Sequence, residues 1–467
     1  MDPLTPPHRA GVTRREVLAR VSHGFGALAF GALHATRALA DDGAPALRAP
    51  HHPARAEHII FLYMDGGPSQ VDTFDPKPRL RAEHGTRIPI ATPKTQFDDV
   101  GAVLGSPFEF RPGGASGLMI SDLFLHVRER ADELCVVRSM HSKFPEHTAA
   151  NYFLHTGHNP AGRPSMGAWL SYGLGSAARD LPGFVVIDGG LVPPGGLECF
   201  GSGFLSPQHQ GSLFRAELGV PNAAAAAPAD REAARRRLLA RLEAERTFAD
   251  RSVDAAIRNA ELAFQMQSAV PELVDLAGET ASTKALYGFD AEYEPTRHYA
   301  RQCLLARRLV ERGVRFVEVT CRGVGHDRWD QHANLEQGHR DNARAVDQPI
   351  AGLLTDLRAR GLLERTLVVF AGEFGRTPMS QGADGRDHNP YGFSIWLAGG
   401  GVKGGHVHGA TDDYGYFAVE DRVSVHDLHA TMLHLVGVDH TRLTFPYSGR
   451  DMRLTDVHGE VVRGLLA

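Results

Sequence analysis

Residues able to bind a metal ion lie next to three apolar stretches of the sequence. Asp65 directly follows "IIFLYM", Glu373 follows "TLVVFAG", and His388 shortly precedes "SIWLA". Carboxylates suit hard or borderline cations, and neutral imidazole is a common metal ligand. Since open α/β sheets bind ligands outside the carboxyl ends of their strands, we predict that Asp65, Glu373 and His388 share one metal site. Asp65 and His388 could instead cap turns.

A second group of polar residues directly follows the apolar stretch "RFVEVT". It contains five acids and histidines in the segment "GHDRWDQHANLEQGH", namely His326, Asp327, Asp330, His332 and His339. This density exceeds that of an ordinary solvated loop, and we predict Asp330 and His332 as further ligands. His339 falls on the following helical pattern and is expected at the surface. Asp72 and Asp75 are expected in turns.

Arg376 stands three residues after Glu373, within "GEFGRTP". Its guanidinium could bind an anionic substrate, or it could pair with a neighbouring carboxylate. The glycine-rich stretch "GGGVKGG" at 399–405 lacks the GxGxxG spacing and the acid about 20 positions later, which argues against a dinucleotide site.

The residues between these groups predict an α/β sandwich. Continuous rather than alternating apolar stretches indicate strands buried on both faces, as in a parallel sheet covered by helices. The predicted strands are 59–64, 134–137, 184–187, 315–320, 366–371 and 394–398. Helical patterns precede two of them and end at Gly313 and Gly361, since glycine is a common helix stop. The segment from 424 to 439 predicts a closing helix.

The segment 222–290 differs from this alternation. It has a long charged helical pattern in which Val253, Ile257, Ala260 and Phe264 recur at helical spacing. We predict a helical insertion with a structural role, because it holds no converging polar cluster.

The first 40 residues are expected to be a twin-arginine signal peptide. Paired arginines in "TRREVL" precede a weakly apolar stretch rich in Gly and Ala, and "ALA" at 38–40 offers a cleavage site. This predicts export of a folded protein to the periplasm or outside the cell, with 41–57 as a linker before a domain from 58 to 467. A disordered basic N-terminus is the alternative. No other stretch is apolar for the ~18 residues that span a bilayer.

The composition narrows the classes of partner. A net charge of −5 with 22% charged residues shows no basic footprint for nucleic acid. The 25 histidines favour metal or proton chemistry. The four cysteines are too scattered for a disulfide framework or a zinc site, and Cys135 and Cys321 are expected in the core.

Six blocks of the sequence resemble the alkaline phosphatase and sulfatase superfamily, and within it the exported family known as domain of unknown function 1501. They cover most of 58–440 except the insertion: "MDGGPSQVDTFDPKP", "RSMHSKFPEHTAANYFLHTGHNP", "RWDQHAN", "VVFAGEFGRTP", "GRDHNPYGFSIWLAGGGVKGGHVHGATD" and "VHDLHATMLHLVGV". The resemblance implies an alkaline-phosphatase-like three-layer sandwich with one or two divalent metals. A nucleophile at a helix N-terminus would attack a phosphate or sulfate ester. It also implies metal-ligand positions at Asp65, Asp330, His332 and His388.

Two positions depart from the superfamily pattern. Where its enzymes end a strand in Asp-His-Gly, this chain has Glu373 and then Phe374, so at least one metal site has lost a ligand. His147 stands where a sulfatase has its modified Cys or Ser, and Asn151 falls at the sulfatase arginine. Thr148 is the nearest hydroxyl, and His147 could bind metal, accept a phosphoryl group or transfer protons.

The leading hypothesis is therefore a metal-dependent hydrolase of phosphate or sulfate esters with a simplified, single-metal site. His147 or Thr148 would lie beside the scissile group of a small anionic ester or a sulfated glycan. Zinc, calcium, magnesium and manganese remain open as the metal. The alternative is a non-catalytic exported protein that binds a sulfated glycan or a protein partner.

Overall fold

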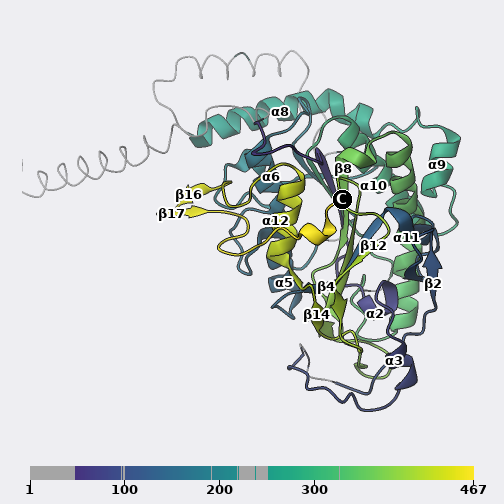
Figure 1. Ribbon diagram of the computed structural model, residues 1–467. Helices are drawn as coiled ribbons and strands as arrows, with labels where there is room; N and C mark the ends of the chain where they lie inside the picture. The colour runs from purple at the N-terminus through teal and green to yellow at the C-terminus, as the bar shows by residue number, and fades with distance from the viewer. Residues whose placement is uncertain are drawn as a thin grey trace, which may run out of the picture. The chain divides into compact units, whose positions relative to one another are not determined.

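A mostly parallel sheet forms the centre of the fold (Figure 1). The computed structural model describes residues 48–467 except 96, 98, 99, 191, 218, 220–236, 238–250 and 326. Within that part of the chain the sheet has nine strands. Their order is β12 (His406–His408), β4 (Leu134–His141), β11 (Phe393–Ala398), β8 (Thr366–Ala371), β1 (His58–Tyr63), β7 (Phe316–Thr320), β5 (Phe184–Ile187) and β6 (Ser212–Phe214), with β15 (Val423–Ser424) also beside β4.

The six predicted strands are all present, and the predicted mostly parallel sheet is confirmed. Only β11 runs antiparallel to its neighbours β4 and β8 in this sheet, as far as the described residues show. Apolar residues run continuously along β11 because both of its faces are covered, whichever way the strand runs. The apolar pattern therefore predicted the strand but could not give its direction.

Helices cover both faces of the sheet and complete the predicted sandwich. Along β1, Ile60 and Leu62 belong to one apolar core, whereas Ile59, Phe61 and Tyr63 belong to the other. The first core includes residues of α4 (Leu125–Arg128), α8 (Arg251–Val274), α9 (Ala281–Tyr287), α10 (Glu294–Glu311) and α11 (Leu335–Ala359). The second includes residues of α5 (His147–Thr156), α6 (Met166–Leu174) and α12 (Val425–Leu435). Successive side chains of β1 thus point to opposite faces of the sheet and contribute alternately to the two cores.

Short elements connect this framework and were not predicted. Two-stranded pairs form between β2 (Phe110–Gly113) and β3 (Leu118–Ser121), between β9 (Gly375–Arg376) and β10 (His388–Asn389), and between β13 (Ala410–Thr411) and β14 (Ala418–Glu420). The remaining elements include α2 (Gln70–Thr73), α3 (Pro78–Ala82), β16 (Phe445–Tyr447) and β17 (Arg450–Met452). Elements of two to five residues bury too little for a periodic pattern to emerge in the sequence.

Asp72 differs from its predicted place in a turn. It lies in α2, is fully buried, and its carboxylate accepts from Arg386 Nε at 2.7 Å and Nη2 at 3.2 Å. Arg386 is fully buried as well. A buried charge is tolerated only when it is paired in this way. The pair anchors the chain directly before β10 to the segment that follows β1.

Several predictions about segments lie partly or wholly outside the described residues. The predicted signal peptide at 1–40 is outside them, as are residues 41–47 of the predicted linker. Of the predicted insertion, α8 and α9 are described, and Met266, Val270 and Leu273 of α8 belong to the first core. All four cysteines are buried and unpaired. No helix among the described residues is long and apolar enough to cross a membrane.

Candidate metal centre

Four side chains from distant parts of the chain converge at the carboxyl end of the central strands. Asp330 and His332 lie in the loop after β7, and His388 begins β10, opposite Arg376 of β9. The fourth is His147, the first residue of α5. One donor atom from each of the four lies within 4.8 Å of the others. Such a spacing lets a single cation contact all four after small side-chain movements.

The three histidines share one orientation, in which an oxygen atom binds Nδ1 and Nε2 faces Asp330. His147 Nδ1 lies 2.7 Å from Glu373 Oε1, and its Nε2 lies 3.0 Å from Asp330 Oδ2. His388 Nδ1 donates to the Pro145 carbonyl at 2.5 Å, and its Nε2 lies 3.3 Å from Asp330 Oδ1. Metal-binding histidines are commonly held in this way, because the acceptor at one ring nitrogen fixes the tautomer that leaves the other free.

His332 repeats the arrangement. Its Nδ1 hydrogen bonds to Gln381 Oε1, and its Nε2 lies 2.9 Å from Asp330 Oδ1. The ring of Phe97 meets the His332 ring edge-on, with centroids 4.8 Å apart. All three Nε2 atoms therefore point toward one carboxylate.

The electrostatics of the cluster suit metal ligands. Burial alone would raise the pKa of Asp330, but Arg376 and the three histidines hold it well below its usual range. Burial, assisted by Arg376, lowers the pKa of His388 to about 4, so this ring is neutral at pH 7. Burial would also lower the pKa of His147, yet its contacts with the carboxylates of Asp330 and Glu373 raise it to about 9. In the metal-free chain at pH 7, His147 is therefore protonated and lies between the carboxylates of Asp330 and Glu373.

The donor set also passes a direct test for a bound cation. Among the described residues, His147 Nε2 is buried and has no hydrogen-bond partner of good geometry, although it lies beside a carboxylate oxygen. An orphaned, buried imidazole nitrogen costs free energy unless something binds it. Three imidazoles and one carboxylate match the ligands that zinc takes. These residues therefore fit a metal ion.

Glu373 lies behind His147 instead of among the four donor residues. It is fully buried, accepts a hydrogen bond from Gly66 N at 3.0 Å, and contacts His147 Nδ1. The structure thus brings the predicted ligand Glu373 to the site, where it orients His147.

Asp65 also lies outside the four. Its Oδ2 pairs with Arg328 Nη1, and its Oδ1 accepts from the hydroxyl of Tyr63 at 3.0 Å. Thr148 follows His147 on α5, and its backbone N–H donates to Glu146 Oε1 at 2.8 Å. Neither predicted residue turns toward the convergence point.

Arg376 takes the second of its two predicted roles, that of a partner for a carboxylate. It is fully buried; its Nη2 lies 2.5 Å from Asp330 Oδ1, and its Nε donates to Gly67 O at 3.0 Å. A side chain so enclosed supports Asp330 from behind. Phe374 completes this wall, since its ring centroid lies 4.4 Å from that of His388 and 4.9 Å from that of His147.

Sequence reasoning overlooked Arg328 and misplaced His339. His339 is buried, not at the surface, and its Nε2 accepts from Ser69 N at 3.1 Å. The helical pattern around it has apolar neighbours on the same face, which was the available signal. Arg328 offered no signal, because a single arginine in a polar loop is ordinary.

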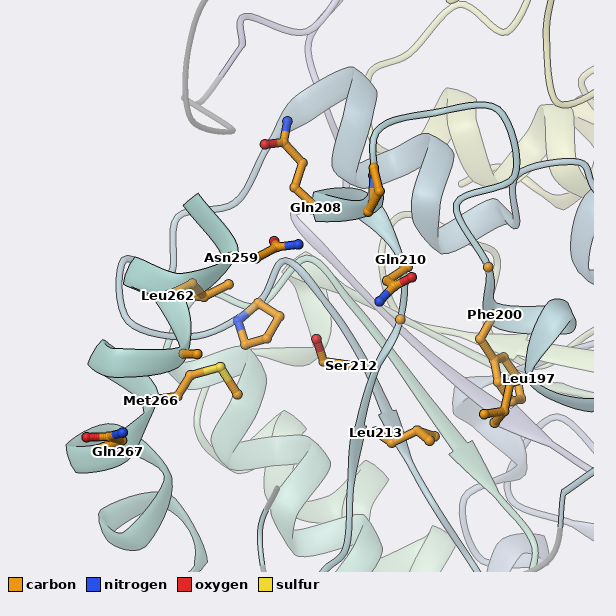
Figure 2. A pocket seen from close by; sticks show the side chains of 15 residues that line it. Leu197, Phe200, Gln208, Gln210, Ser212, Leu213, Asn259, Leu262, Met266 and Gln267 are labelled. Carbon is orange, nitrogen blue, oxygen red and sulfur yellow. The ribbon is translucent and has the colours of Figure 1, made fainter. Parts of the chain in front are cut away.

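Two hollows differ in their chemistry. The first has a volume of about 240 Å³ and is lined by Asp65, Gly66, His147, Pro194, Asp327, Arg328 and Asp330. The second, of about 590 Å³, lies between α8 and β6 (Figure 2), where Leu262 and Met266 of α8 and Leu213 of β6 line it. Its lining has no titratable side chain. Only the first hollow, here called the site cavity, borders the histidine cluster.

The fold and this centre define an α/β protein with a histidine- and aspartate-lined candidate metal site. The chain belongs to the family described as protein of unknown function DUF1501, whose model matches residues 56–466. No curated protein sequence matches it.

Several solved structures are similar to this chain at low sequence identity, and one of them is described as a protein in the alkaline phosphatase superfamily from Vibrio parahaemolyticus. The lipoteichoic acid synthase LtaP from Listeria monocytogenes is 10% identical, with 90% of this chain and 80% of that chain covered and a TM-score of 0.38. The phosphonate monoester hydrolase SpPMH from Silicibacter pomeroyi is 11% identical, with 85% and 76% covered and a TM-score of 0.37. The PsFucS1 sulfatase from Pseudoalteromonas sp. is 14% identical, with 87% and 70% covered and a TM-score of 0.36. Similarity at this level does not assign an activity, so the chemistry of the site is argued from this chain's own residues.

Proposed function

We propose that this protein is a metal-dependent hydrolase of phosphate or sulfate esters that uses a single divalent cation. The observation that supports this most is the convergence of His147, His332 and His388 on Asp330, each histidine with Nε2 inward. Of these four residues, His388 is buried and the other three are partly exposed. Withdrawing polar groups from water destabilises a fold unless they are paired, so their convergence is informative about function.

Zinc is the cation that the donor set favours. Calcium and magnesium prefer shells of oxygen ligands, whereas imidazole nitrogen suits zinc and other transition metals. A divalent cation held by these residues would supply positive charge that stabilises the developing charge on a phosphorus or sulfur ester.

Water is the attacking nucleophile in this proposal. Thr148 is not among the residues that line the site cavity, and Nε2 of His147 lies 3.0 Å from Asp330 Oδ2, among the proposed metal ligands, so we assign the attack to water. Attack of water forms a new bond from oxygen to phosphorus or sulfur and breaks the bond to the leaving alcohol, which takes up a proton. The site cavity of about 240 Å³ fits the tetrahedral end of a small ester or of a sulfated glycan.

The full mature chain tests this function directly. Its metal content would be measured by elemental analysis, followed by assays of aryl phosphate, phosphodiester and aryl sulfate hydrolysis with and without chelator. We expect about one zinc per chain and turnover that chelator abolishes and added zinc restores. A folded, metal-free protein inert on every ester would contradict the proposal and support the alternative of a binding protein.

We further propose export by the twin-arginine route, which the paired Arg14 and Arg15 support. Replacing both by lysine should retain the protein in the cytoplasm, because this route reads the arginine pair. Fractionation of producing cells checks the result, with Arg20→Lys as the matched control. Equal export of the double variant and the control would contradict the proposal.

A further inference from the structure

Arg328 reaches into the site cavity from the loop after β7. Its side chain is 9% exposed and lines the cavity together with His147 and Asp330. Its Nη1 contacts Asp65 Oδ2. The permanently charged Arg328 side chain therefore lies beside the candidate metal centre. Among the ion pairs of the described residues, Arg328 pairs with Asp65 and with none of the four candidate ligands.

The backbone at Arg328 is fixed in an uncommon conformation. Its φ is +24°, and its carbonyl accepts hydrogen bonds from the side-chain amides of Asn342 and Gln331. A residue other than glycine holds such a conformation only when its surroundings impose it, and such positions concentrate at ligand-binding sites. The two amides thus set the direction in which the Arg328 side chain leaves the loop.

Gly66 brings this loop against the end of β1. A Cβ atom at Gly66 would lie 2.7 Å from Asp330 N and 2.9 Å from Trp329 N, and its φ is +104°. Only glycine permits this approach. The same approach places Asp65, the preceding residue, opposite Arg328.

Asp65 is held in place as the counter-charge of Arg328. Tyr63 donates its hydroxyl to Asp65 Oδ1, and the same hydroxyl contacts Asn151 Oδ1. Asn151 is fixed in turn by its donation to Pro194 O at 2.9 Å. Arg328 thus supplies positive charge at Asp65 through Nη1 and also lines the cavity. Its guanidinium has five N–H donors, more than the contact with Asp65 can use.

We propose that Arg328 is an oxyanion-binding residue that donates to the non-bridging oxygens of a tetrahedral phosphate or sulfate group in the site cavity. This inference rests on the proposed function for the identity of the substrate, but anion binding is a separate property. The planar guanidinium matches two oxygens of such a group, and a charge-assisted hydrogen bond of this kind is stronger than a neutral one. Asp65 competes with the anion for the same donors and so limits its affinity.

Equilibrium binding of inorganic sulfate and inorganic phosphate tests the proposal by calorimetry on the full mature chain. Arg328→Gln should weaken binding roughly 10- to 100-fold, the range expected for a lost hydrogen bond to a charged group. The affinity of Arg328→Lys should lie between those of the unaltered chain and Arg328→Gln, because lysine keeps the positive charge but loses the paired N–H donors of the guanidinium. Asp65→Asn should tighten binding several-fold, because it removes the competing charge.

Arg322→Gln is the matched control, since Arg322 lies in the same loop and pairs outward with Glu294 at 2.8 Å. It should bind both anions as the unaltered chain does. If metal content and circular dichroism are unchanged in Arg328→Gln, its weaker anion binding has a local cause. If that variant does not fold, Arg328→Lys should still weaken anion binding and Asp65→Asn should still strengthen it.

Equal affinity of Arg328→Gln and the unaltered chain, or no anion binding by the unaltered chain, would overturn the proposal. Anion binding that depends on Arg328 in a protein that hydrolyses no ester would instead overturn the proposed function and leave this site standing.

Discussion

The Asp330→Asn and His388→Ala variants should each be purified with less than about a tenth of the zinc bound by the unaltered chain, and ester turnover should fall roughly 1,000-fold or more. Asp330 contacts all three histidines, so its loss removes a predicted ligand and the group that aligns the others. His388 is almost fully buried, and no water can readily replace its nitrogen.

Glu373→Gln should also lower bound zinc and ester turnover, but less than Asp330→Asn and His388→Ala do. Glu373 contacts His147 Nδ1 from outside the cluster, and replacing such a supporting residue typically weakens metal affinity about 10- to 100-fold. Elemental analysis, chelator competition and turnover on one preparation of each variant would measure the series.

His406→Ala is the control for this series, since His406 lies on β12 and is only partly buried. Thermal unfolding would show whether Asp330→Asn also loosens Arg376, its buried partner. Unchanged zinc in both Asp330→Asn and His388→Ala would contradict the metal centre, whatever happens to activity.

The Asp72→Ala variant should lose about 3–5 kcal/mol of unfolding free energy, because it leaves the charge of Arg386 buried and unpaired. Chemical denaturation at pH 7 would measure this loss. The segment before β10 should also loosen, since Arg386 leads directly to His388. Metal affinity is therefore expected to fall along with stability.

This loss should depend on pH in a defined direction. Burial alone would raise the pKa of Asp72, but Arg386 outweighs it and the pKa is lowered from its usual value. A carboxyl with a depressed pKa in the folded state contributes stability that is present above its unfolded pKa of about 3.9 and is lost as the pH falls further. The difference between the unaltered chain and Asp72→Ala should thus be full at pH 7 and shrink below about pH 4.

Asp413→Ala is the matched control for this experiment. Asp413 also pairs with an arginine, Arg79 at 3.1 Å, but this pair is exposed. Exposed pairs contribute little to stability, so we expect almost no change. An Asp72→Ala variant as stable as Asp413→Ala would contradict the role given to the buried pair.

The sequence predicted the sheet and part of the site for one reason. Buried parallel strands have a strong apolar signal, and their carboxyl ends meet at one edge, so Asp65, Glu373, Asp330 and His332 could be placed near that edge from their positions after strands. His388 precedes its strand and lies at the same edge because β11 runs antiparallel to its neighbours. That they bind metal remains a prediction. His147 was recognised as a site residue only through the resemblance to the sulfatase pattern, and its role was left open.

The remaining details depend on contacts that a linear sequence does not contain. Asp65 and Glu373 both end strands, yet one faces Arg328 and the other His147. The first of these contacts involves Arg328, whose φ is positive and whose carbonyl accepts hydrogen bonds from Asn342 and Gln331. Nothing in the local pattern marks a non-glycine residue for that conformation.

The four residues of the candidate metal centre come from three distant segments of the chain, at His147, at Asp330 and His332, and at His388, and the completed sheet brings these segments together. An unfolded chain would instead offer 25 histidines with no preferred partner. Under the proposed function, metal uptake would therefore follow folding and report on it. Under the proposed export by the twin-arginine route, a chain that had bound its metal would cross the membrane already folded.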